Sequence, residues 1–327
     1  MVAAPDKFRG TATASEVAGA IAAAARDVGW TCTELPLADG GEGTLAALGG
    51  PNRTSTVSGP LGDDVVAAWR LSRGVAVIEM ALASGLELVG GAEGNDPIAA
   101  STYGTGELIA EAVESGARRV IIGVGGSATT DGGLGALRAL YPLQRLRGVE
   151  LLVACDVRTG FVEAAEVFAG QKGASAAQIE LLRRRLERLA QVYLDEHGVD
   201  VLTLEHAGAA GGLAGGLAAA GAELVEGFDV VADELELDEA LEAADLVITG
   251  EGFLDEQSFE GKVVGGVAER ARALDVPVVC IAGAVYAEAG EAIEALSLVE
   301  RYGEEQARAD VVACIREVAA TRLRSGG

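Results

Sequence analysis

Residues 118–133 read Arg-Arg-Val-Ile-Ile-Gly-Val-Gly-Gly-Ser-Ala-Thr-Thr-Asp-Gly-Gly. An apolar run that ends in glycines and hydroxyl residues is typical of a buried strand followed by a tight turn into a helix. Backbone N–H groups in such a turn attract anions, and hydroxyls add further donors. We therefore predict that Gly125, Gly126, Ser127, Thr129 and Thr130 bind a phosphate or a carboxylate.

Strands and helices alternate on both sides of this segment, which predicts an α/β fold with a mainly parallel sheet. The predicted strands are Val2–Ala4, Thr31–Leu37, Val75–Met80, Arg118–Val124, Val149–Ala154, Asp245–Thr249 and Val276–Ala282. Helices are predicted from about Ser15, at Thr105–Ser115 and at Ala176–Glu196. Active sites on such sheets lie at the carboxyl ends of the strands. Most of these predicted strands end in Gly, Ser, Thr or Asp, so we expect the site there.

Composition narrows the class of protein. The 327 residues are 50% hydrophobic but only 4% aromatic, which suits Ala- and Gly-rich packing of helices on a parallel sheet, in two domains rather than one. A formal charge of -25 opposes binding to nucleic acid and to anionic membranes. The sequence leaves open whether the chain forms a homo-oligomer.

Cysteine and histidine usage excludes several kinds of site. The four cysteines are widely spaced and are interpreted as reduced core residues. With only His197 and His206, histidine metal clusters and Ser-His-Asp triads are not expected, so carboxylates must supply any general base. No basic leader and no apolar run of roughly 18 residues is found, which predicts a cytoplasmic protein.

Carboxylates and a few cations gather at the predicted strand ends. The carboxylates are Asp6, Asp39, Glu42, Asp131, Asp156, Glu251 and Asp255, and the cations are Lys7, Arg9, Lys172 and Lys262. Phosphoryl transfer needs carboxylates for Mg²⁺ and for the attacking hydroxyl, with cations to balance the phosphates. Gly261-Lys262 is not followed by the Ser or Thr of a P-loop, so any kinase activity here uses another arrangement.

Two alternatives compete with a kinase. Gly123, Gly125 and Ala128 match the G-x-G-x-x-A spacing of nicotinamide-dependent oxidoreductases, but the ribose-binding acid expected about 20 residues on is missing, since Asp156 comes late. A non-catalytic sugar-acid sensor would not need the carboxylates that this chain keeps.

A series of motifs along nearly the whole chain resembles that of the bacterial glycerate kinases, in the same order. These stretches are Ala4–Gly10, Pro36–Thr44, Ser101–Glu107, Gly125–Gly133, Gln171–Ala174, Gly208–Gly212 and Thr249–Lys262. The run Gly-Gly-Ser-Ala-Thr-Thr-Asp-Gly-Gly is the most specific of them.

The resemblance implies transfer of the γ-phosphoryl group from ATP to D-glycerate with Mg²⁺, giving 2-phosphoglycerate in preference to the 3-isomer. It also implies a flavodoxin-like domain made from 1–55 and 235–327, an inserted α/β domain at 56–234, and an active site in the interdomain cleft. By the resemblance and the placement of charge, Asp156, Asp131, Arg9 and Lys262 are the predicted catalytic residues. Asp6, Lys7, Asp39, Gly40, Gly41, Glu42 and Lys172 join the Gly125 turn as predicted binding residues, and Glu251 and Asp255 are the predicted metal ligands.

The chain departs from the family pattern in three places. Arg9 stands where the family usually has lysine, and Lys7 where it has serine. After Asp156, the usual Asn-Pro-Leu is replaced by Arg158-Thr159-Gly160, and the segment between Leu140 and Leu151 is short. These differences leave the acceptor open, and the sequence does not rank Asp156 and Asp131 as the base.

Overall fold

The computed structural model describes residues 1–259, 261–286 and 293–325 and divides into two compact units. Unit 1 comprises Met1–Asp39, Ala46–Leu48 and Phe228–Gly327, and unit 2 comprises Gly40–Leu45 and Gly49–Gly227. The domain limits predicted from the sequence, 1–55 with 235–327 and 56–234, stay a prediction. The two units are defined by how compact they are and not by whether each folds independently. The short helix α2 (Thr44–Ala47) lies where the chain passes from one unit to the other.

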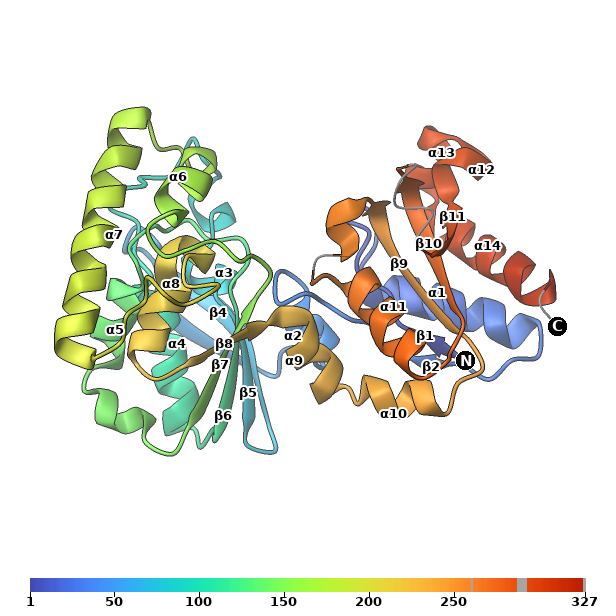
Figure 1. Ribbon diagram of the computed structural model, residues 1–327, viewed down its shortest axis with the longest axis horizontal. Helices are drawn as coiled ribbons and strands as arrows, with labels where there is room; N and C mark the ends of the chain where they lie inside the picture. Colours follow the sequence, from blue (N-terminus) through green and yellow to red (C-terminus); the bar gives the residue numbers. More distant parts are fainter. Residues whose placement is uncertain (260, 287–292, 326–327) are drawn as a thin grey trace. The chain divides into compact units, whose positions relative to one another are not determined.

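Unit 1 is built on a parallel sheet (Figure 1). Its described strands are β1 (Val2–Ala3), β2 (Thr33–Glu34), β9 (Val247–Leu254), β10 (Val278–Val285) and β11 (Glu294–Ser297). They lie in the order β11-β10-β9-β1-β2, and all neighbours pair in parallel. Numbered by their order within this unit, the strands are arranged 2-1-3-4-5, which is the flavodoxin-like order. The predicted fold of the chain ends is thereby confirmed.

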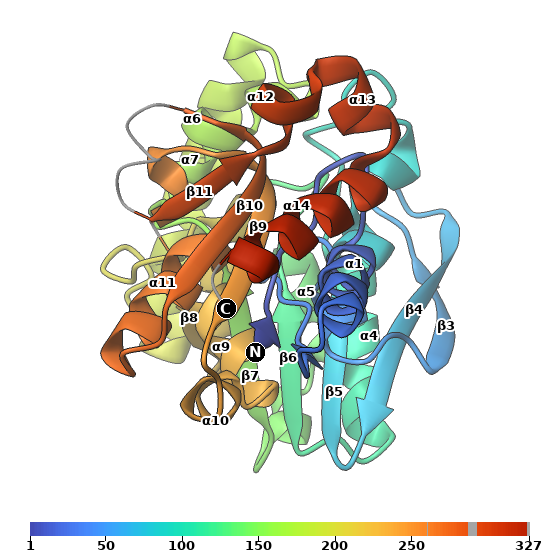
Figure 2. The same ribbon diagram turned by 90° about the vertical axis from the view of Figure 1, so that its right-hand side faces the viewer.

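Helices cover both faces of this sheet. The helices of unit 1 are α1 (Ala14–Asp27), α9 (Gly227–Glu234), α10 (Leu237–Glu242), α11 (Val263–Ala273), α12 (Leu298–Tyr302), α13 (Glu304–Ala309) and α14 (Val311–Ser325). One core joins α1 and α14 to the strands through Ile21, Ile248 and Ile315, and Figure 2 shows both helices over one face. The other core joins α9 and α11 to the sheet through Val231 and Val267.

Unit 2 contains a mixed sheet in the order β3-β4-β5-β6-β7-β8. Its strands are β3 (Arg53–Ser58), β4 (Asp64–Ser72), β5 (Val75–Glu79), β6 (Arg119–Gly123), β7 (Glu150–Cys155) and β8 (Glu223–Glu226). The first two pairings are antiparallel and the remaining three are parallel. The carboxyl ends of β5 to β8 therefore lie at one edge, where the Gly125 turn begins.

Two apolar cores hold the helices of unit 2. These helices are α3 (Ala81–Ser84), α4 (Tyr103–Glu114), α5 (Leu134–Leu140), α6 (Ala164–Phe168), α7 (Ala176–His197) and α8 (Ala209–Ala219). The larger core joins the sheet to α4, α5 and α8 through residues such as Ile122 and Leu213. The smaller core joins α6 and α7 around Phe161 and Tyr193. Helix α7 begins with a capping box between Ser175 and Gln178 and ends at Gly198, close to its predicted limits.

Some predicted boundaries are corrected by the structure. The strand expected to end at Thr249 continues through Gly250-Glu251-Gly252 to Leu254, because Glu251 still pairs with Ala282 of β10. Helix α1 is capped by Thr13, whose side chain accepts from the Glu16 amide, rather than by Ser15. The β3–β4 hairpin was not predicted, since its inward alternation is interrupted by half-buried and exposed positions.

Backbone close approach at glycines shapes the region beside the Gly125 turn. At the start of α8, Ala210, Gly211 and Gly212 adopt left-handed φ angles of 51°, 69° and 88°. A Cβ on Gly211 would lie 2.0 Å from the Thr129 carbonyl oxygen, so no larger residue fits without displacing that loop. In the described part of the chain, no helix is long and apolar enough to cross a membrane.

We expect Gly211→Ala to destabilise the protein far more than Gly221→Ala. Gly221 also has a positive φ, of 97°, but a Cβ there meets nothing within 4 Å. The Gly221 variant should therefore lose only the left-handed strain of about 1–2 kcal/mol, whereas Gly211→Ala adds a backbone clash and should lose about 3 kcal/mol or more. Urea unfolding measures both, and equal losses would show that the Thr129 contact is unimportant.

Candidate active site

Acidic side chains of unit 1 lie where its strand order reverses, between β1 and β9. Asp6 follows β1, and its N–H donates a 2.9 Å hydrogen bond to the Gly250 carbonyl, beside Glu251 on β9. This reversal is the usual place of ligand sites in open α/β sheets. The structure therefore brings together two of the predicted residues that are far apart in the sequence.

The two carboxyl groups are in an unfavourable environment for charge. Burial raises the pKa of Glu251 to about 7, and the charges of Asp6 and Asp255 add to that effect against the Ser258 hydrogen bond and Lys262. Burial raises the pKa of Asp6 to about 6, and Asp39 acts in the same direction against Lys7 and Lys262. Glu251 Oε1 is buried and has no hydrogen-bond partner among the described residues. A bound cation would relieve this repulsion.

A short turn places the next acid and lysine. The Asp255 N–H donates to Ser258 Oγ at 3.0 Å, and Asp255 Oδ1 accepts from the Ser258 N–H at 3.1 Å. Lys262 follows at the N-cap position of α11 and is half-buried. Arg9 is exposed, and its backbone lies beside Gly252 of β9. Asp6, Lys7, Asp39, Glu251, Asp255 and Lys262 thus belong to one unit.

The glycine-rich turn after β6 provides free donors in unit 2. Among the residues that the structure describes, the amides of Gly125 and Gly126 donate no hydrogen bond, and Gly126 is exposed with a φ of 73°. Ser127, Thr129 and Thr130 are buried, and the two threonine hydroxyls have no hydrogen-bond partner in the described part of the chain. The accessible donors of this turn are therefore backbone N–H groups, whereas the predicted hydroxyls lie behind them.

Lys172 lies under this turn. Its side chain is 3% exposed, and Nζ donates to Ser127 Oγ at 2.8 Å and to the Thr129 carbonyl at 2.7 Å. Asn95 Nδ2 connects the same parts by donating to the Ala128 and Lys172 carbonyls. Burial lowers the pKa of Lys172 to about 7, opposed by the charge of Asp131. The contacts are those of a residue that holds the turn.

Asp131 is occupied by structural hydrogen bonds. Its carboxylate accepts from the N–H and hydroxyl of Thr102 and from the amides of Gly133 and Gly135, at 2.9 to 3.1 Å. These bonds join the start of α4 to the start of α5. Asp156 instead follows the end of β7 in a half-buried position.

The Asp39-Gly40-Gly41-Glu42 motif is divided between the units, since Asp39 belongs to unit 1 and the following residues to unit 2. Gly40 accepts a hydrogen bond from the Val124 amide, and a Cβ on it would lie 2.7 Å from the Ala154 carbonyl oxygen. Gly40 and Gly41 therefore lie against the ends of β6 and β7. Glu42 is exposed beside them.

Three residues of this region were not predicted as functional. Glu79 Oε1 accepts from the Gly43 and Leu45 amides, Asn95 braces the Gly125 turn, and Thr102 binds Asp131. The only sequence signal for Thr102 was its place in the Ser101–Glu107 motif. Glu79 and Asn95 carry no local pattern, because their partners are distant in the chain.

Paired carboxylates at a switch point, lysines beside them and a glycine-rich anion turn are features of α/β enzymes that act on phosphorylated substrates. The model of the glycerate kinase family matches residues 1–141 and 142–321, and the chain belongs to that family.

Individual relatives agree with this assignment. The chain is 42% identical to glycerate 2-kinase of Escherichia coli over 330 aligned residues, covering 89% of this chain and 86% of the relative. It is 39% identical to glycerate kinase of Bacillus subtilis, with 87% and 85% covered. A crystal structure of a protein assigned as glycerate kinase 2 of Salmonella typhimurium LT2 superposes with a TM-score of 0.85 at 38% identity, covering 99% and 98% of the two chains.

We expect Lys172 to make stability depend on pH. Its folded pKa of about 7 lies below the ordinary value of 10.5, so between these values the unfolded chain binds a proton that the folded protein has released. The contribution of Lys172 to the free energy of unfolding is therefore fully present above pH 10.5 and is lost as the pH falls through 7.

Urea unfolding of the wild type and Lys172→Met at pH values from 7 to 9.5 measures this contribution. The wild type should gain stability relative to the variant as the pH rises, by up to about 1.4 kcal/mol per pH unit. Lys262→Met, which removes a half-buried lysine, is the control. Parallel pH profiles for wild type and Lys172→Met would contradict the assignment.

Proposed function

We propose that this protein transfers the γ-phosphoryl group of ATP to D-glycerate and that the 2-hydroxyl is the acceptor. Family membership over nearly the whole chain carries the choice of glycerate, and the similarity to glycerate 2-kinase of Escherichia coli supports the 2-position. The structural observation that supports phosphoryl transfer is the pair Asp6 and Glu251, whose charges are unfavourable until a cation is near.

Magnesium fits the donor set of unit 1. In the described ranges, no group of three or more His, Cys, Asp or Glu side chains is arranged to hold a metal ion by itself. Mg²⁺ is commonly held by one or two carboxylates together with substrate phosphates and water. The unpartnered Glu251 Oε1 agrees with such a partial site, and Glu251 and Asp255 would hold the ion. When bound, it would neutralise charge on the phosphates.

The cations of unit 1 have distinct proposed tasks. Lys262 is a point charge on a flexible stem, which suits contact with a phosphoryl group that changes position. Arg9 is exposed and offers a planar fork that suits a phosphate or the glycerate carboxylate. Lys7 lowers the pKa of Asp6, and its backbone N–H also donates to Asp6 Oδ1 at 2.7 Å.

In unit 2, the Gly125 and Gly126 amides are the proposed binding groups for an anionic oxygen. We propose that Lys172 acts as a positioning residue beneath them, because both described hydrogen bonds of its ammonium group go to the turn itself. Backbone donors that are held rigidly need no rearrangement when charge develops, which favours electrostatic catalysis.

Asp156 is the proposed general base in preference to Asp131. Both are carboxylates at strand ends, but the oxygens of Asp131 accept four groups that hold α4 and α5 in place. A base must be able to take a proton without losing such bonds.

We also propose that the protein acts in the cytoplasm, as its sequence predicts.

A coupled assay of ADP release tests the proposed function. Purified protein with ATP, Mg²⁺ and D-glycerate should release ADP, and phosphorus NMR of the product should show 2-phosphoglycerate. Other short hydroxy acids serve as acceptor controls. NAD binding without ADP release would favour the oxidoreductase alternative, and glycerate binding without ADP release would favour the sensor.

Asp156→Asn should lower kcat by roughly 10²- to 10⁴-fold, because the amide keeps the size of the side chain but cannot accept a proton. Asp131→Asn should instead reduce the free energy of unfolding by about 1–3 kcal/mol, since an amide NH₂ would face backbone donors. Steady-state kinetics and urea unfolding of both variants separate the roles. A normal kcat for Asp156→Asn would place the base elsewhere.

Lys262→Ala should lower turnover steeply with little change in stability, since partly exposed substitutions usually alter it by about 0.5 kcal/mol. Lys262→Arg keeps the charge and should retain more activity than the alanine variant. ADP-release kinetics at saturating ATP and glycerate provide the measurement. If Lys262→Ala turned over normally, this lysine would be a solvated residue at the start of a helix.

A further inference from the structure

A pocket of about 730 Å³ lies within unit 2, separate from the exposed Gly125 and Gly126 amides. One wall is formed by α7, and the others by residues 98–101 and the start of α5. Figure 1 shows α7 and α5 in the same part of this unit. The volume is within the range of about 300–1,000 Å³ that small-molecule sites have.

The pocket is rich in arginine, although the protein carries a formal charge of -25. Arg138 lines it from α5, and Arg184, Arg185 and Arg188 line it from α7. Among the described residues that line it, Asp131 is the only acid, and its oxygens are engaged with Thr102, Gly133 and Gly135. An anion that most of the protein surface repels would therefore be attracted here.

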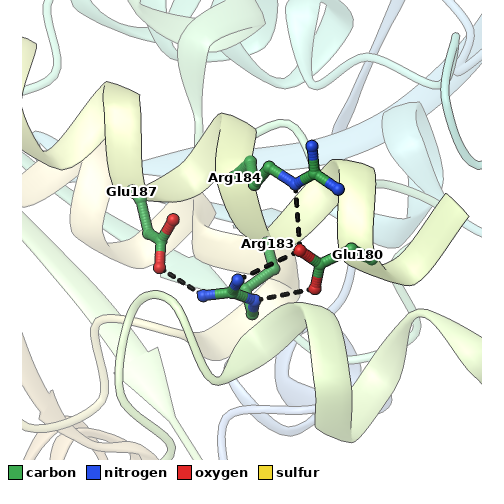
Figure 3. A network of polar contacts seen from close by, with 4 residues as sticks. All are labelled: Glu180, Arg183, Arg184 and Glu187. Atoms are coloured by element: carbon green, nitrogen blue, oxygen red, sulfur yellow. Dashed lines mark hydrogen bonds and ion pairs between the residues drawn. The ribbon is translucent and has the colours of Figure 1, made fainter. Parts of the chain in front are cut away.

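The ion pairs of α7 leave part of this charge unused. Figure 3 shows Arg183 bound to Glu180 and Glu187, and Arg184 bound to Glu180 at 2.9 Å. The Arg185 guanidinium donates to the Ile98 carbonyl at 3.0 Å. Within the described ranges, Arg138 and Arg188 have neither an ion-pair nor a hydrogen-bond partner. Two guanidinium groups thus remain for a ligand.

The remaining lining shows what else the ligand must contain. Leu134, Leu181, Leu189, Val192 and Ile98 supply apolar surface around the arginines. Simple inorganic ions would leave this surface wet, whereas a ligand with an apolar part would cover it. The planar arginine guanidinium matches the oxygens of a phosphoryl group. The two negative charges of that group can pair with the two guanidinium groups of Arg138 and Arg188.

We propose that this pocket binds a small organic phosphate, with the phosphoryl group on Arg138 and Arg188 and the organic part on the leucines. Thr130 and Asp131 line the pocket and also belong to the loop that continues from Gly125 and Gly126. Occupancy of the pocket is thereby connected by a few residues to the proposed anion site of that turn. The nucleotide and the phosphorylated product are both sources of this chemistry.

Isothermal titration without glycerate tests the proposal. The probes are ADP and 2-phosphoglycerate, with orthophosphate, adenosine and glycerol as partial probes that lack one half of the chemistry. The double variant Arg138→Gln/Arg188→Gln should weaken the tighter organic phosphate at least tenfold, which corresponds to about 1.4 kcal/mol. Orthophosphate, adenosine and glycerol should bind more weakly than that probe to the wild type.

Two further proteins distinguish the pocket from other binding. Arg183→Gln/Arg308→Gln makes the same change in net charge with arginines that are paired to glutamates outside the pocket, and should change the Kd less than twofold. Lys262→Ala should still bind the organic phosphate whose binding the Arg138→Gln/Arg188→Gln variant weakens. Equal weakening in both double variants, or loss of all binding in Lys262→Ala alone, would overturn the proposal, as would no binding of either organic phosphate.

Discussion

The loop between β6 and α5 is held in place mainly by contact of backbone with backbone. Gly211, in a left-handed conformation, approaches the Thr129 carbonyl so closely that a side chain cannot be added. Gly40 likewise lies against the Ala154 carbonyl at the end of β7, because it has no side chain that would collide with it. Because such contacts leave little room for adjustment, the amides of Gly125 and Gly126 are presented in one geometry.

The three lysines of this acidic protein lie where a positive charge contacts a backbone turn or neighbouring carboxyl groups. Lys172 is buried with its ammonium group on Ser127 and Thr129, whereas Lys7 and Lys262 oppose the raised pKa values of Asp6 and Glu251. Arginine has a different use, since most of its described contacts are ion pairs with exposed glutamates and aspartates. Exposed pairs of this kind contribute little to stability. The pocket arginines differ because two of them, Arg138 and Arg188, have no such partner among the residues that the structure describes.

The parallel strands and the positions of the strand-end residues could be predicted from sequence, since both follow from short apolar runs and the turns after them. The antiparallel β3–β4 hairpin could not, because most of its residues face solvent or are partly exposed. The hydrogen bonds that occupy the Asp131 carboxylate were equally hidden. Thr102 is 29 residues from Asp131, and no local pattern tells that its hydroxyl and amide occupy that carboxylate. Lys172 presents the same difficulty, since no local pattern shows that distant segments bury it and that its ammonium group donates to Ser127 and Thr129.

The surroundings of Asp6 and Glu251 in unit 1 also decide how readily these two carboxyl groups lose their protons. A carboxyl group in water is ionised near neutral pH, but burial beside other carboxylates raises the pKa values of Asp6 and Glu251. A structure that only required stability would replace one of these acids by an apolar residue or pair it fully. Glu251 instead has an oxygen with no partner in the described ranges, at the point where the strand order reverses. Unfavourable charge at this reversal of the strand order agrees with the proposed binding of a cation and a polyphosphate there.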